Sequence, residues 1–222
     1  MTIRRSCWTV AAAVALIVIL GAAAFCLAFG GWRRITQFWV AHMLKSSGAE
    51  VYVVGNSWDE GPWSLFPARR YRVVFSGVRP NLQLTSRLGR VSDLSLENVQ
   101  LGANDCAELG NLATLETLEL AHVVVPLDGW ERMGKLRSLV SIIIVDVKVG
   151  EPGAVWLARL PSLVYLWGDG ARFPSSQPLA GDIFPRLQQA TFVNCELGTE
   201  FLAALSHAPL EQLDLLNSRF PE

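Results

Sequence analysis

The chain has 222 residues and a formal net charge of −1, and 51% of its residues are hydrophobic while 18% are charged. This composition excludes a polycation that coats nucleic acid, and it also excludes an acidic disordered chain. The charge is unevenly divided: residues 1–90 hold 11 basic and 3 acidic groups, whereas residues 91–222 hold 8 basic and 17 acidic groups. The resulting break, from +8 to −9 near residue 90, indicates two parts with different surroundings.

An uncharged apolar run of 20 residues extends from Val10 to Phe29. As a helix it would be about 30 Å long, which matches the hydrocarbon thickness of a bilayer. The alternative is a cleaved signal peptide, but its apolar part usually has only about 7–15 residues and ends at small side chains. We therefore expect residues 1–32 to be an uncleaved signal-anchor, and the chain to be a single-pass membrane protein that contacts the lipid bilayer through this transmembrane helix. Basic residues on both sides leave its orientation open.

Residues 33–66 are predicted to form a juxtamembrane helix followed by a linker or cap. Apolar residues recur there at helical spacing, at Ile35, Phe38, Trp39 and Met43. A short strand is expected at 51–54, and the Gly-, Pro- and Trp-rich stretch 56–67 is expected to be a loop.

Past residue 90 the sequence repeats with a period of about 24 residues. Each unit has an apolar residue followed by others three and five positions later. A short strand would turn these later two positions to one side, where neighbouring units share a core. The six sets are Val91/Leu94/Leu96, Leu115/Leu118/Leu120, Leu139/Ile142/Ile144, Leu163/Leu166/Gly168, Leu187/Ala190/Phe192 and Leu210/Leu213/Leu215. We expect a domain over residues 67–222, with a degenerate first unit at 67–90 and regular units from 91.

This pattern resembles the leucine-rich repeat family, and its arrangement behind an apolar segment is similar to that of short membrane-anchored bacterial proteins of this type. The resemblance implies an α/β leucine-rich repeat solenoid, with a right-handed, curved parallel sheet and helical or irregular returns, preceded by one transmembrane helix. The family's Asn/Cys column fits only at Cys195, so the turn backbone groups must find other partners. Polar residues stand one place before that column, at Asn98, His122, Asp146, Asn194 and Asn217.

Catalytic chemistry has no recognisable motif in this sequence. There are only three histidines, and the four cysteines lack the spacing of a zinc site or a disulfide scaffold. We expect no enzymatic activity, no catalytic residue, no cofactor and no metal. Two alternatives stay open: a structural envelope protein without a specific ligand, and a hydrolase with an unrecognised site. A pocket that gathers two or more titratable side chains would favour the hydrolase.

An apolar patch is predicted on the exposed face of the third and fourth units, between more acidic units. Its candidate partner-binding residues are Val140, Ile143, Val145, Tyr165 and Trp167. Such a patch with a charged rim is typical of protein-binding surfaces, so we predict a module that binds an unknown protein partner and no nucleic acid. The alternative is that Gly168 leaves an inward position empty and a register shift buries Trp167. Exposure of Tyr165 and Trp167 decides between the two.

Six arginines fall within 22 residues in and beside the degenerate unit: Arg69, Arg70, Arg72, Arg79, Arg87 and Arg90. Two interpretations are open, since the arginines could attract anionic lipid or could pair with the acidic groups of the repeats.

Overall fold

The computed structural model describes residues 36–57, 68–174, 178–179 and 183–220. The chain divides into two compact units, Met1–Trp39 and Val40–Glu222. Residues 36–39 of the first unit are helical. The boundary falls inside the segment 33–66 that was predicted to be a helix and linker. The fold and the candidate site described below belong to the second unit.

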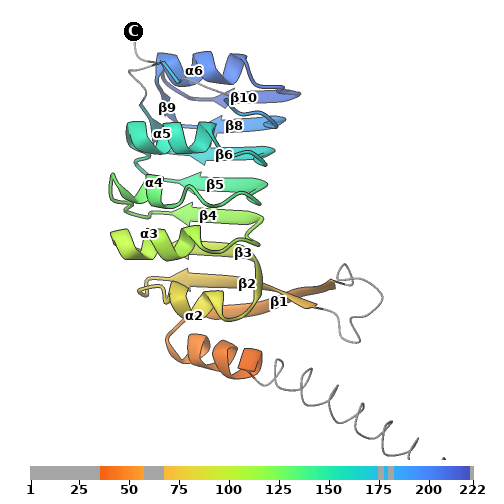
Figure 1. The fold of residues 1–222 in the computed structure, drawn as a ribbon. Coiled ribbons are helices and arrows are strands. Elements are labelled where there is room, and N and C mark those ends of the chain that lie inside the picture. Colours follow the sequence, from red (N-terminus) through yellow and green to blue (C-terminus); the bar gives the residue numbers. More distant parts are fainter. Residues whose placement is uncertain (1–35, 58–67, 175–177, 180–182, 221–222) are drawn as a thin grey trace, which may run out of the picture. The chain divides into compact units, whose positions relative to one another are not determined.

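An eight-stranded sheet is the frame of the second unit, and its strand order is β1-β2-β3-β4-β5-β6-β8-β10 (Figure 1). A separate two-stranded sheet is formed by β7 and β9. The strands are β1 (Glu50–Ser57), β2 (Ala68–Ser76), β3 (Arg90–Glu97), β4 (Thr117–Ala121), β5 (Ser141–Val145), β6 (Tyr165–Asp169), β7 (Arg172–Phe173), β8 (Gln189–Val193), β9 (Glu196–Leu197) and β10 (Gln212–Leu216). The strand expected at 51–54 is confirmed as part of β1.

The predicted fold class is wrong. It named a right-handed, curved parallel sheet in a leucine-rich repeat solenoid preceded by a transmembrane helix. The structure instead has a mixed sheet of eight strands, and the described residues do not show the solenoid. Strand β1 pairs antiparallel with β2, whereas the other neighbours in the large sheet pair parallel. The physical reason is the small separation in sequence, because only ten residues stand between Ser57 and Ala68, whereas a parallel pair needs a crossover of about a dozen residues or more.

The predicted membrane-spanning helix also requires correction. Over the ranges described above, no helix has both the length and the apolar character needed to cross a bilayer. The run from Val10 to Phe29 lies outside the described residues. The expectation of a single-pass, signal-anchored membrane protein is therefore withdrawn.

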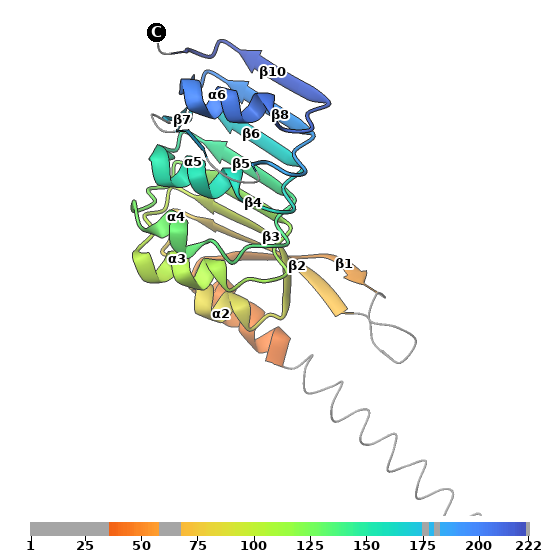
Figure 2. The same cartoon turned by 45° about the horizontal axis from the view of Figure 1, so that its top comes forward.

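The helices of the second unit are few and short. Residues 40–46 are helical and precede β1. The later helices are α2 (Leu82–Ser86), α3 (Ala103–Gly110), α4 (Gly129–Arg132), α5 (Gly150–Ala158) and α6 (Thr199–Ser206). In Figures 1 and 2, the helices α2 to α6 lie on one side of the sheet, so the other face of the sheet is free of them.

The core lies between the sheet and these helices. Alternate strand residues supply it, and Leu118 and Leu120 of β4, like Ile142 and Ile144 of β5, are fully buried. Their burial confirms that the positions three and five after the first apolar residue of a unit point inward in these strands. The residues between them in each strand therefore occupy the opposite face, where the predicted patch lies.

Candidate interaction face

The strand register decides whether Trp167 belongs to the core. Trp167 pairs with Ile143 on one side and Thr191 on the other, and Gly168 lies between Ile144 and Phe192. A Cβ atom built on Gly168 would lie 3.1 Å from Cε2 of Phe173 and 3.1 Å from Cδ1 of Phe192. These rings already fill the space that Gly168 leaves, so no register shift brings Trp167 inward.

Tyr165 and Trp167 instead emerge on the exposed face of β6, with 44% and 50% of their surface accessible. Ile143 and Val145 occupy the same face of β5 and are half-buried. We call these four residues the aromatic patch. Val140 precedes β5 and is also half-buried, and its carbonyl accepts hydrogen bonds from the N–H groups of Val164 and Tyr165. Its peptide group therefore helps hold the neighbouring strand in register.

Polar side chains flank the aromatic patch in the cross-strand rows. The row through Trp167 continues to Thr191 and then to Asp214, and the row through Tyr165 continues to Gln189 and Gln212. On the other side, Ile143 is followed by Glu119 of β4. Side chains in adjacent strands of one row are close enough to share a contact with a partner. The apolar centre is thus bordered by hydrogen-bonding groups on both sides.

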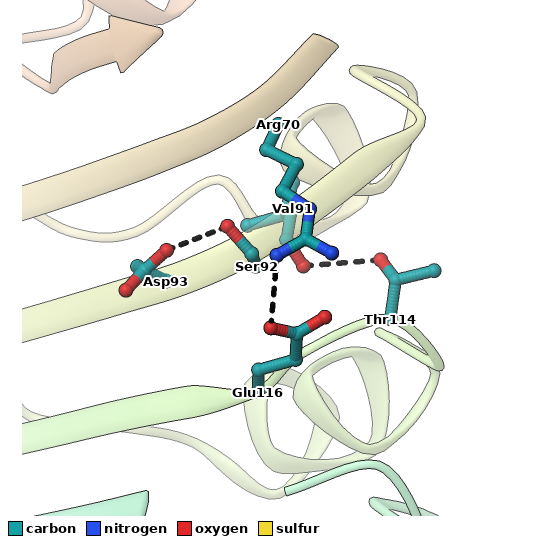
Figure 3. A network of polar contacts seen from close by, with 6 residues as sticks. All are labelled: Arg70, Val91, Ser92, Asp93, Thr114 and Glu116. Atoms are coloured by element: carbon teal, nitrogen blue, oxygen red, sulfur yellow. Dashed lines mark hydrogen bonds and ion pairs between the residues drawn. The ribbon is translucent and has the colours of Figure 1, made fainter. Parts of the chain in front are cut away.

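Ion pairs occupy the sheet face beside the patch, toward β2. Arg70 Nη1 lies 3.3 Å from Glu116 Oε2 (Figure 3). Arg72 Nη2 lies 3.8 Å from Glu119 Oε2. Both pairs reach from β2 across β3 toward β4. Away from this face, Arg79 Nη2 lies 3.9 Å from Oδ2 of Asp105 in α3. For these three arginines, the predicted pairing with acidic groups of the repeats is confirmed.

Beneath these ion pairs, the two serines of β3 are buried although they are polar. Ser92 and Ser95 have only 2% and 9% of their surface exposed. The Ser92 hydroxyl donates a hydrogen bond to Asp93, and the Thr114 hydroxyl donates one to the carbonyl of Val91 (Figure 3). This part of the face is already satisfied by its own contacts, and between β2 and β8 the large hydrophobic side chains exposed on the described strands are Tyr165 and Trp167 of β6.

The other border of the patch is formed by the turns that follow the strands. His122 Nδ1 lies 3.5 Å from Asp146 Oδ2, and Asn194 donates a hydrogen bond of 3.3 Å to Asp169. The turn residues Asn98, His122, Asp146, Asn194 and Asn217 all have a φ of 51–54°. This polar column is visible in the sequence, but its left-handed conformation was not predicted. The preference of Asn, Asp and His for positive φ was the available signal.

A groove of about 720 Å³ lies on the helical side of the unit. Most of its described lining is apolar, but Glu131, Glu151 and Arg159 also border it. The groove therefore gathers more than two titratable side chains, which is the arrangement expected to favour the hydrolase alternative. No Ser, Thr, Cys, His or Lys occurs among its described lining residues. Trp156 also lines it, yet its Nε1 is buried and has no hydrogen-bond partner in the described part of the chain, so this N–H is not presented to the groove. The hydrolase alternative stays untested.

The two described cysteines are poor nucleophiles. Burial, together with the nearby carboxylates of Asp105 and Asp128, raises the pKa of the Cys106 thiol to about 11. Burial also raises the pKa of Cys195. Both thiols are therefore protonated and unreactive near neutral pH. Within the described ranges, no group of three or more His, Cys, Asp or Glu side chains could hold a metal ion.

Comparison of the chain with known protein families, with curated protein sequences and with solved structures found no match.

Proposed function

We propose that this protein is a binding module, and that it receives a protein partner on the sheet face centred on the aromatic patch. The observation that carries the proposal is the pair Tyr165 and Trp167, which stand on one face of one strand with about half of their surface exposed. Burying a Trp and a Tyr together supplies large apolar contact at low entropic cost, and these residues are enriched among those that dominate binding energy.

The surroundings of the pair support a protein partner in particular. Ile143 and Val145 extend the apolar surface along β5, while Thr191 and Gln189 offer hydrogen bonds on β8. An apolar centre with a polar border is the usual anatomy of a protein interface. The resemblance of the repeats to the leucine-rich repeat family favours the same role, since repeat surfaces of that kind commonly bind proteins.

Photo-crosslinking at single positions tests the proposal. A benzophenone amino acid at Trp167 is expected to give protein adducts in intact cells, and Ile143→Asp should suppress them by placing a charge inside the contact. The control position is Leu127, which is 71% exposed but lies between β4 and α4. If position 167 gives no adduct that position 127 lacks, the aromatic patch is not a partner-binding surface.

A further inference from the structure

The strands that carry and flank the aromatic patch are acidic. From β4 to β10, the strands of the large sheet include the carboxylates of Glu119, Asp169 and Asp214 and contain no Lys, Arg or His. The arginines that form ion pairs across this face, Arg70 and Arg72, both belong to β2. A partner that lies over β5 and β6 therefore meets negative charge from the strands beneath it.

Asp169 is the carboxylate closest to Trp167 along the chain. The two residues are two positions apart in β6, so their side chains leave the same face of the sheet, about 6.6 Å apart along the strand. Oδ1 of Asp169 accepts a hydrogen bond of 3.3 Å from the neutral amide of Asn194, and no basic side chain of the described residues forms an ion pair with Asp169. Its negative charge is therefore available to a cationic group of a partner.

The ring of Trp167 is also available. The aromatic contacts within the described part of the chain, such as Trp130 with Trp156 and Phe173 with Phe201, join buried side chains and do not include Trp167. Half of the surface of Trp167 is accessible, so a cation can approach its ring. Among the aromatic side chains, tryptophan attracts a cation most strongly.

An arginine side chain suits both groups at once. Its planar guanidinium stacks on an aromatic ring and still donates N–H groups in its own plane to a carboxylate. An arginine that lies along β6 can therefore cover Trp167 and reach Asp169. A lysine ammonium is a strongly hydrated point charge without a plane to stack, so it suits this pair less well. An acidic segment is repelled by the same carboxylates.

We propose that the partner of the aromatic patch presents a basic segment, and that an arginine of this segment stacks on Trp167 and pairs with Asp169. The inference rests on the proposed function and adds the chemical class of the partner. Thr191 and Asp214 follow Trp167 in its cross-strand row, so they receive the neighbouring polar or basic residues of the segment.

Defined peptides test the charge of the partner on the full chain, kept in a mild non-ionic detergent. The probe is an immobilised peptide that alternates arginine with glycine, and its matched control carries citrulline, the neutral isostere of arginine, at the same positions. We expect the arginine peptide to bind about tenfold more tightly than the citrulline peptide, because only arginine brings a cation to the ring and the carboxylate. Equal binding of the two peptides overturns the proposal.

Three substitutions locate the contact. Trp167→Ala and Asp169→Asn should each weaken binding of the arginine peptide about threefold or more. Asparagine keeps an acceptor for the amide of Asn194, so the fold is retained in the second variant. The control is Asp128→Asn, which removes an exposed carboxylate at the start of α4 and should change binding by less than about 1.5-fold. Equal losses from Asp169→Asn and Asp128→Asn indicate a general attraction to acidic groups and contradict the proposal.

Crosslinking at position 167 separates this result from that of the proposed function. Adducts in cells, together with no preference for arginine over citrulline, overturn the basic partner and leave the binding module in place. If position 167 gives no adduct beyond those of position 127, both proposals fail. Adducts together with the arginine preference and its dependence on Trp167 and Asp169 support both.

Discussion

At the scale of single residues, the turns after the strands depend on left-handed backbone conformations. Asn98 and His122 have φ values of 54° and 53°, and Gly170 fills the same column with a φ of 61°. The N–H of each donates to a carbonyl at the end of the next strand, as Asn98 does to Ala121 at 2.9 Å. These bonds supply the partners that the turn backbone requires.

Two substitutions at Asn98 separate backbone strain from side-chain contacts. Asn98→Gly is expected to leave the free energy of unfolding nearly unchanged, because glycine adopts positive φ without a steric penalty. Asn98→Val should lower it by about 1–2 kcal/mol, because a branched side chain collides with the following carbonyl in this conformation. Guanidinium chloride unfolding measures both. Equal losses from the two variants would show that the side chain of Asn98 matters and its φ does not.

The buried thiol of Cys106 predicts a loss of stability at alkaline pH. Its folded-state pKa of about 11 is above the value in the unfolded chain, so folding favours the protonated thiol. The contribution of this thiol to the free energy of unfolding is complete below pH 9. It falls by about 1.4 kcal/mol per pH unit as the pH rises toward 11. Cys106→Ala should flatten this part of the profile in unfolding experiments between pH 8 and pH 11. An unchanged slope would assign the alkaline loss to other groups.

At the scale of elements, β6 differs from its neighbours because it has glycine at an inward position. Other strands place Leu120, Ile144 or Phe192 there, and the rings of Phe173 and Phe192 occupy the space over Gly168. The vacancy that the sequence indicates is therefore filled by side chains of β7 and β8. This compensation leaves Trp167 on the exposed face.

Replacing Gly168 by the leucine of the repeat pattern is expected to destabilise the protein. Gly168→Leu overpacks a filled site, which should lower the free energy of unfolding by about 1–3 kcal/mol. Ser141→Leu, on the exposed face of β5, is the control and should change it by less than about 0.5 kcal/mol. Chemical unfolding compares the two. A gain in stability from Gly168→Leu would contradict the packing described for β6.

The repeat period could be read from the sequence because each unit places apolar residues at the same positions, and their burial follows from strand alternation. Exposure of Tyr165 and Trp167 could not be settled from the sequence, because it depends on Phe173 and Phe192 filling the space over Gly168. The antiparallel pairing of β1 was also missed, since a lone apolar strand carries no sign of its direction. The left-handed turns were missed although their Asn, Asp and His residues signal them.

At the scale of the whole molecule, the charge division near residue 90 is partly neutralised within the fold. Arg70 and Arg72 of the basic part pair with Glu116 and Glu119 of the acidic part. These partly exposed pairs contribute little to stability, about 1 kcal/mol or less each. Their consequence is positional, because they occupy the sheet face next to β4 and so border the aromatic patch on that side.

The central claim is that the aromatic patch binds a protein partner, and one measurement tests it most directly. The dissociation constant of the partner captured by the crosslinker at Trp167 should be compared for the unaltered chain, Trp167→Ala and Leu127→Ala. We expect Trp167→Ala to weaken binding by about 30-fold or more, as removal of a central aromatic anchor does, and Leu127→Ala to leave it unchanged. Equal dissociation constants for the unaltered chain and Trp167→Ala would contradict the claim.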